Sequence, residues 1–111
     1  MFRFTNSHHS VIPVVSGLIC FSFLVSCAGL PPIKEYSLAR EAISQAEKHK
    51  ADKHYPGYYG KALKLYRSGE SAFKDRYYDR AGDRFEEAAE YAERSEDLTR
   101  IKRARVGDHG F

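Results

Sequence analysis

The sequence predicts an all-α protein, and two observations lead to that prediction. Beyond residue 32, apolar residues recur at intervals of three and four, the spacing that gathers them on one face of a helix. No stretch shows the strict alternation of apolar and polar residues that marks a half-buried strand, and Ala, Glu, Lys and Arg dominate this part. We therefore expect a short antiparallel three-helix bundle.

The first helix is expected at about residues 33–54. Pro31 and Pro32 stiffen the chain before it and favour a helix start. The apolar face of this helix carries Ala39, Ala42, Ile43 and Ala46. Charged residues occupy the opposite face, as in an amphipathic surface helix. Tyr55, Pro56 and Gly57 follow and are expected to end the helix.

A second helix is expected at about residues 58–74 and a third at about residues 77–105. The same period runs through Ala62, Leu65, Tyr66, Gly69, Ala72 and Phe73, and then through Tyr78, Ala81, Phe85, Ala88, Ala89 and Ala92. Asp75 and Arg76 alone connect the two helices, and so short a connection implies antiparallel neighbours. The helical domain would span residues 33–106, and residues 107–111 would form a flexible tail.

The pair of helices from Leu65 to Ala92 is similar to a tetratricopeptide-like helical hairpin. Gly69 occupies the small position of its first helix, and Arg76 stands where the turn glycine is usual. Most inward positions are alanine, which buries less area than leucine, so aromatic residues must supply most of the burial. So thin a core leaves open an alternative, in which the domain completes its fold only within an oligomer or a larger envelope machine.

Residues 1–26 are typical of a secretion signal peptide. Arg3 gives a weakly basic start, and the apolar run Val11–Val25, about 15 residues, is shorter than the roughly 20 that a membrane-spanning helix needs. The run ends in Leu24, Val25, Ser26 and Cys27, which resemble the lipobox of bacterial lipoproteins. That resemblance implies cleavage between Ser26 and Cys27. The alternative is an uncleaved anchor in which Cys27 is an ordinary small residue.

The lipobox also implies where the mature protein is located. Cys27 would carry a diacylglycerol on its sulfur and an acyl chain such as palmitate on its nitrogen, and residues 27–32 would be a short tether to the membrane. Ala28, rather than aspartate, follows this cysteine, which implies the periplasmic face of the outer membrane in bacteria with two membranes.

From about residue 31 to residue 92, the chain resembles the small lipoproteins of the domain-of-unknown-function family 4398. The resemblance is carried by the lipobox, by Pro31 and Pro32, and by Ala39, Ala42, Ala46, Tyr55, Ala62, Ala72, Tyr78, Ala81, Ala88 and Ala92. It implies this architecture and brings no activity or ligand with it.

Patterns that would carry catalysis or metal binding were not found, and we expect no enzyme. The sequence has no nucleophile elbow and no glycine-rich phosphate loop, and its mature form would keep no free thiol. His49 and His54 are too far apart around a helix to chelate one metal, and we expect them to face solvent. Asp75, Asp79 and Asp83 each precede an arginine that neutralises them. No cofactor besides the lipid and no small-molecule substrate is expected.

Nucleic acid is excluded as a partner by export and by charge. Without the leader, 17 of the 18 basic residues face 15 acidic ones, which leaves a net charge of only +2. The partners that remain are the membrane, the cell wall and other envelope proteins. We therefore expect a membrane-anchored, non-enzymatic binding or scaffold module.

Two surfaces are candidates for that binding. After an acidic stretch, the third helix ends in a basic cluster, defined as Arg100, Lys102, Arg103 and Arg105. It is either a solvated helix end or a contact with anionic lipid headgroups or acidic groups of the cell wall. The second candidate is a set of tyrosines at helix ends, Tyr58, Tyr59 and Tyr77, which either pack in the bundle or anchor a protein partner.

Overall fold

The computed structural model of the chain describes residues 29–109, and this part is all-α, as predicted. Helices make up 87% of it, and it contains no strand. The elements are α2 (Ile33–Lys48), α3 (Ala51–His54), α4 (Pro56–Lys74) and α5 (Tyr78–His109). Within these residues, no helix has the length and apolar composition that crossing a bilayer would need. The predicted signal peptide, the lipobox and Cys27 lie outside the described residues.

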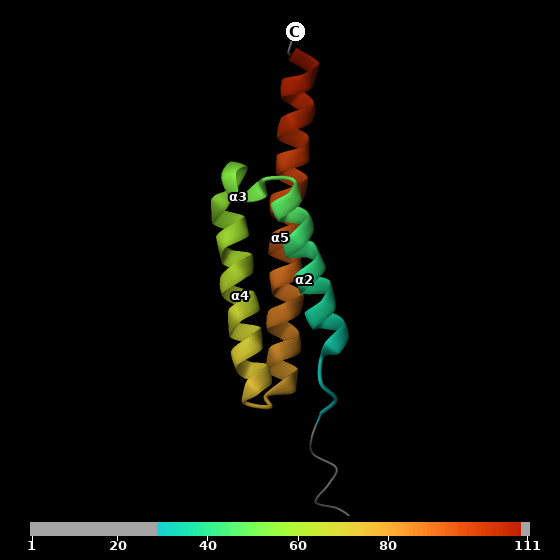
Figure 1. The fold of residues 1–111 in the computed structure, drawn as a ribbon, viewed down its shortest axis with the longest axis vertical. Helices are drawn as coiled ribbons and strands as arrows, with labels where there is room; N and C mark the ends of the chain where they lie inside the picture. The colour runs from blue at the N-terminus through green and yellow to red at the C-terminus, as the bar shows by residue number, and fades with distance from the viewer. Residues whose placement is uncertain (1–28, 110–111) are drawn as a thin grey trace, which may run out of the picture.

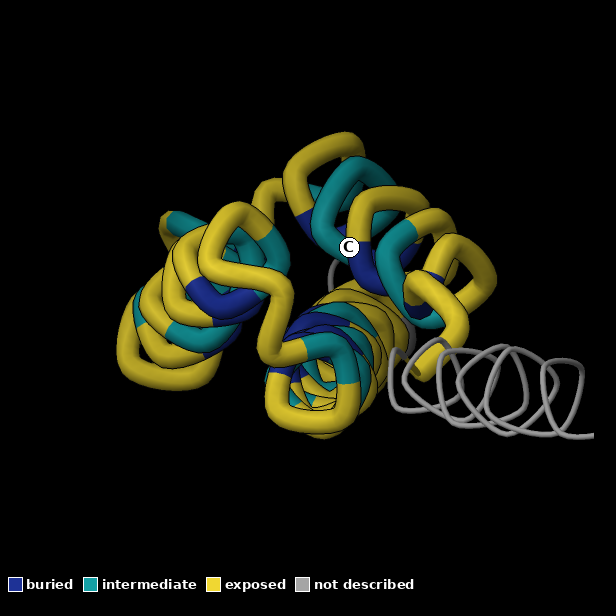
Figure 2. Tube along the Cα trace, turned by 90° about the horizontal axis from the view of Figure 1, so that it is seen from below, coloured by how far each residue is buried: buried dark blue, intermediate teal, exposed yellow. Residues whose placement is uncertain are grey.

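The long helix α5 is the element on which the others pack. Both α2 and α4 lie along it, whereas they touch each other at few residues. The chain runs up α2, down α4 and up α5, so α4 is antiparallel to both of its neighbours (Figure 1). Seen along the bundle, the buried residues lie on the sides where the long helices face one another (Figure 2). The result is a short three-helix bundle.

The core consists of alanine around a single phenylalanine. Of the ten buried hydrophobic residues among those described, nine are alanines and the tenth is Phe85, the largest fully buried side chain. The ring of Tyr36 meets Phe85 edge-on at 5.3 Å between centroids, and Tyr66 lies 5.6 Å from it. Tyr36 and Tyr66 also stack at 5.7 Å, which joins α2 to α4. Aromatic residues therefore supply the bulk that alanine cannot.

Gly69 of α4 makes room for the Phe85 ring. A Cβ built at Gly69 would lie 2.7 Å from two carbon atoms of that ring, closer than real side chains approach. The two helices can therefore pack this closely only with glycine at this position. This explains the small residue that the helical-hairpin resemblance placed here.

The connection from α4 to α5 is a tight turn through a left-handed residue. Arg76 has a φ of 62°. Its N–H donates to the carbonyl of Phe73, and the N–H of Tyr77 donates to that of Ala72, at 3.1 and 2.9 Å. This pair of bonds is the Schellman motif, whose left-handed position favours glycine. Arg76 thus adopts the conformation of the turn glycine that it replaces.

The helix expected at residues 33–54 is divided in the structure. Helix α2 ends at Lys48, and α3 begins at Ala51. Of the two residues between them, Lys50 has a φ of 62°, which an α-helix cannot contain, so the chain changes direction here. Alanine spacing alone could not reveal this break, because Ala46 and Ala51 are both buried on the two sides of it.

Two further boundaries differ from the expected ones. Helix α4 begins at Pro56, because proline suits the first position of a helix. Helix α5 continues to His109, past the expected end near residue 105, since one glycine in an exposed helix costs only about 1 kcal/mol and need not end it. All residues from 100 to 107 are exposed, and this part of α5 extends beyond the bundle (Figure 1).

Candidate functional site at the two ends of the bundle

The basic cluster lies on the free end of α5, beyond the last packed residue. That residue is Thr99, which is fully buried, like Ser95 one turn before it. The hydroxyl of Ser95 donates to the carbonyl of Ala92 at 2.7 Å, and that of Thr99 donates to the carbonyl of Ser95 at 2.8 Å. These bonds satisfy the buried hydroxyl groups within α5 itself, so the helix needs no other polar partner there.

The charges of the basic cluster are spread around α5. At about 100° per residue, Arg100, Lys102 and Arg105 point in three different directions. The ammonium group of Lys102 lies 6.0 Å from the centre of the Tyr55 ring, so it leans back toward the start of α4. The free end is therefore positive on all sides, without the single apolar face of a membrane-surface helix.

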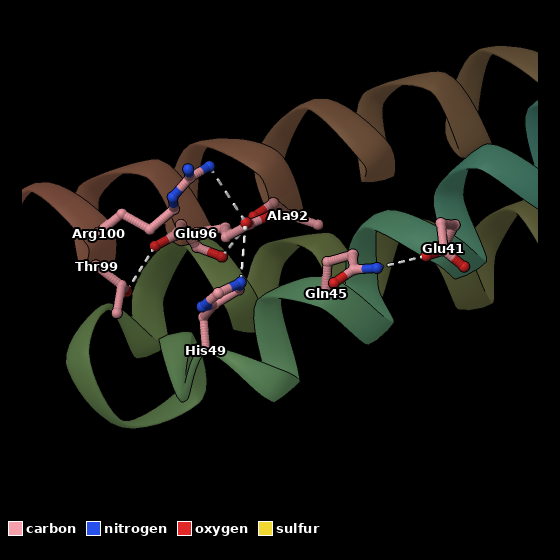
Figure 3. Close-up of polar contacts among 8 residues, drawn as sticks. Glu41, Gln45, His49, Ala92, Glu96, Thr99 and Arg100 are labelled. Atoms are coloured by element: carbon pink, nitrogen blue, oxygen red, sulfur yellow. Dashed lines mark hydrogen bonds and ion pairs between the residues drawn. The ribbon is translucent and has the colours of Figure 1, made fainter.

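Glu96 links the start of the free end of α5 to His49, the residue that follows α2. Its Oε1 lies 3.4 Å from His49 Nε2 and 3.7 Å from Arg100 Nη1 (Figure 3). His49 is thus half-buried beside a carboxylate, whereas we expected it to face solvent. Arg100 belongs partly to this local ion pair. The three cations beyond it, Lys102, Arg103 and Arg105, are the more available for a partner.

Tyr58 and Tyr59, which the sequence proposed as contact residues, serve mainly as packing residues. Tyr58 is 37% exposed, and its ring stacks on that of Tyr91 with the centroids 6.2 Å apart. Tyr59 is half-buried against the upper core. Burial, helped by the charges of Glu47 and Asp52, raises the pKa of Tyr59 above its usual value. Tyr59 is therefore the less exposed of the two, and the Tyr58 ring has one face against Tyr91.

The third tyrosine, Tyr77, is at the opposite end of the bundle and is open to solvent. It lies in the turn between α4 and α5 and is 58% exposed. The guanidinium carbon of Arg80 lies 5.2 Å from the centre of its ring, within the range of a cation–π contact. Of the three predicted tyrosines, Tyr77 is the most exposed.

The segment before α2 lies beside this same turn. Pro32 is buried, and a Cβ at Gly82 would lie 3.4 Å from its Cβ atom. A Cβ at Gly29 would lie 3.5 Å from a carboxylate oxygen of Asp79. Residues 29–32 therefore lie beside the first turns of α5. This is the end of the bundle opposite the basic cluster (Figure 1).

Two exposed apolar residues at this end were not predicted as contact residues. Leu30 is 91% exposed and Ile33 is 58% exposed. The signal that could have revealed them is their position, since both flank the two prolines next to the lipobox and neither belongs to the alanine-spaced face.

The described residues contain no group of three or more His, Cys, Asp and Glu side chains that could hold a metal ion. The chain matches no protein-family model, no curated protein and no solved structure. The resemblance to family 4398 therefore stays a prediction, and the function must be argued from the two ends of the bundle.

Proposed function

We propose that this chain is a lipid-anchored lipoprotein of the bacterial envelope that acts without catalysis, as a helical binding module. Its partner would be the cell wall or another envelope protein. The observation that supports the proposal is that residues 29–32, which would belong to the tether, lie at the opposite end of the bundle from the basic cluster. At about 1.5 Å per residue, α5 separates Tyr78 from Arg105 by about 40 Å.

This separation favours one of the two contacts considered for the basic cluster. Anchored by Cys27 at one end, an upright bundle holds its cations about 40 Å from its own membrane. That distance is several times the screening length of about 8 Å at physiological salt, so headgroups of that membrane would attract the cluster little. Acidic groups of the cell wall, or an acidic surface of an envelope protein, would be within its reach.

The anchor is tested by the mass of the membrane-bound protein. The wild type should begin at Cys27 and carry the added mass of the diacylglycerol and the acyl chain. The substitution Cys27→Ala should leave an unprocessed precursor without acyl groups. A mature N-terminus at any other residue, or a wild type without acyl groups, would refute the lipoprotein proposal.

The binding role is tested by removing the available cations. The mature protein in detergent should bind purified cell wall at low salt and lose this binding as salt rises, because exposed charges are screened. The triple substitution Lys102→Gln, Arg103→Gln and Arg105→Gln should abolish it. A matched control removes the same charge from exposed residues of α4, by Lys61→Gln, Lys64→Gln and Arg67→Gln, and should bind nearly as the wild type does.

Equal loss in both triple variants would mean that only net charge matters. If the wild type binds no cell wall even at low salt, the cluster is a solvated helix end or a site for a protein. A cross-linking residue on the free end of α5, at Ala104, should then trap an envelope protein in cells.

A second candidate function, an obligate subunit of an oligomer, is supported by the composition of the core. A core of nine alanines and one phenylalanine buries little apolar area, and chains of this size seldom gain more than about 3 to 5 kcal/mol from one core. Dilution separates the two proposals. A binding module keeps its melting temperature when diluted, whereas an obligate subunit melts at a lower temperature.

A further inference from the structure

We propose that the tether end of the bundle is itself a membrane contact surface, which lies in the headgroup region of the bilayer and holds the domain upright. The proposal deepens the proposed function, because it rests on the lipid anchor at Cys27. The surface consists of Leu30, Ile33 and Tyr77. All three are large apolar side chains, and each is at least 58% exposed.

These three residues gather at one end because of how the chain enters the bundle. Leu30 and Ile33 lie on either side of the two prolines, and Pro32 packs against Gly82 near the start of α5. Tyr77 directly precedes α5. The start of α2 and the turn between α4 and α5 therefore form the same end of the molecule (Figure 1). Three exposed apolar side chains thus lie at the end of the molecule from which the chain runs toward Cys27.

A phospholipid bilayer is the partner that fits this surface. Tyrosine prefers the boundary between headgroups and acyl chains, where its ring is buried and its hydroxyl stays hydrated. The guanidinium group of Arg80 lies against the Tyr77 ring. If the ring is inserted below the lipid phosphates, the long Arg80 side chain can still reach a phosphate. The proximity of Cys27 supports this choice, because the three residue steps from it to Leu30 span at most about 10 Å.

The charges at this end nearly cancel, which makes the contact different from that of the basic cluster. The cations are Lys34, Lys74, Arg76 and Arg80, and the carboxylates are Glu35, Asp75 and Asp79. Because the net charge at this end is small, electrostatic attraction to anionic lipid should contribute little to the membrane contact. The contact should form on neutral bilayers and should change little with salt.

Fluorescence can locate this end, because the chain contains no tryptophan. Two reporters are compared, each made at an exposed position: Tyr77→Trp at the tether end and Ile101→Trp, where the native side chain is 49% exposed, on the free end of α5. The lipidated protein is reconstituted in phosphatidylcholine vesicles with brominated acyl chains, which quench tryptophan that reaches them. We expect strong quenching and a blue-shifted emission for Tyr77→Trp at low and high salt, and neither effect for Ile101→Trp.

A second pair of variants tests the surface itself. In the Tyr77→Trp background, Ile33→Gln should weaken the quenching, whereas Ile101→Gln should leave it unchanged. Helical circular dichroism should stay the same in both, because both native residues are exposed.

Three other outcomes would each contradict a specific part of the proposal. Equal quenching of the two reporters would mean that the bundle lies flat, which overturns the upright orientation. An unquenched Tyr77→Trp on protein whose mass includes the acyl chains overturns the membrane contact and leaves the lipid anchor intact. Protein without acyl chains that fails to sediment with vesicles overturns the anchor and this inference together.

Discussion

Phe85 is the residue on which the stability of the bundle depends most. It is fully buried, and both Tyr36 and Tyr66 pack against its ring. Phe85→Ala should cost about 3 to 5 kcal/mol, because it deletes a large buried side chain from a core of alanines. That loss is comparable to the whole stability expected of so thin a core. Circular dichroism at growth temperature should show most of the helical signal lost.

Arg84→Ala is the control next to Phe85. Arg84 pairs with Glu87 at 3.2 Å on the surface, and exposed pairs of this kind contribute at most about 1 kcal/mol. The variant should melt close to the wild-type temperature. If Phe85→Ala and Arg84→Ala are tolerated equally, the packing of α5 on its neighbours is not the source of stability.

Gly69 should not tolerate even one methyl group. A Cβ there would lie 2.7 Å from the Phe85 ring, and overpacking of this kind costs about 1 to 3 kcal/mol, more than helix propensity returns. Gly60 in the same helix has no atom within 4 Å of such a Cβ. We therefore expect Gly69→Ala to lower the melting temperature and Gly60→Ala to raise it. A rise in both would show that α4 and α5 are farther apart.

At Arg76, in contrast to Gly69, a change to glycine should stabilise the protein. A non-glycine residue in the left-handed region costs about 1 to 2 kcal/mol, and glycine avoids most of this at an entropy cost of about 0.5 to 1 kcal/mol. Arg76→Gly should therefore raise stability by about 0.5 to 1 kcal/mol in a chemical denaturation. The control Arg80→Gly, within α5, should lower it by about 1 kcal/mol. A loss in both variants would argue against the left-handed turn.

At the scale of an element, the free end of α5 is a helix whose residues from 100 to 107 are all exposed, with the contact of Lys102 on the Tyr55 ring near its base. Isolated helices this short are marginal in water, so its helicity must propagate from the packed part of α5. The Glu96–Arg100 pair at 3.7 Å and the cations near the helix C-terminus assist it.

Hydrogen exchange should reveal this difference along one continuous helix. Amides of residues 102–109 should exchange much faster than those of residues 85–99, because opening the free end disrupts no core. Exchange measured by mass spectrometry at peptide resolution is sufficient. Equal protection along all of α5 would mean that the free end is packed against something, such as a second copy of the chain.

At the scale of the whole molecule, the partly buried tyrosine Tyr66 should make the protein less stable at alkaline pH. Burial, with the phenol of Tyr36 beside it, raises the pKa of Tyr66 well above its usual value near 10. As pH rises past 10, the unfolded chain loses this proton while the folded one keeps it, so the unfolded state is favoured. This contribution is fully present below about pH 10 and is lost above it.

Thermal melts at neutral pH and near pH 11 should therefore show a drop in melting temperature for the wild type. Tyr66→Phe should show a smaller drop between the two pH values, since the titrating hydroxyl is gone. The control Tyr77→Phe alters a tyrosine that is 58% exposed and should behave like the wild type. If Tyr66→Phe falls as steeply as the wild type, the alkaline loss comes from other groups.

Much of the fold was predictable because the spacing of apolar residues within one segment of the sequence is enough to indicate a helix and its buried face. Ala39, Ala62, Ala81 and Ala92 are fully buried as their spacing indicated, whereas Ala89, on the same predicted face, is only partly buried. The two-residue connection at Asp75 and Arg76 implied antiparallel helices, because no longer path was available to the chain. The resemblance to a helical hairpin also put Gly69 at a small position, whereas its contact with the Phe85 ring came from the structure.

The sequence by itself thus determined the helices, the faces they bury and the candidate residues for the lipid anchor and the basic cluster. Only the tertiary structure decided which of these features share an end. It places the start of α2, with Leu30 and Ile33, at the same end of the bundle as the turn that carries Tyr77, while the basic cluster projects from the other end. The physical reason is that periodicity reports the direction of a side chain around its own helix, whereas proximity between helices depends on where turns such as those at Lys50 and Arg76 reverse the chain.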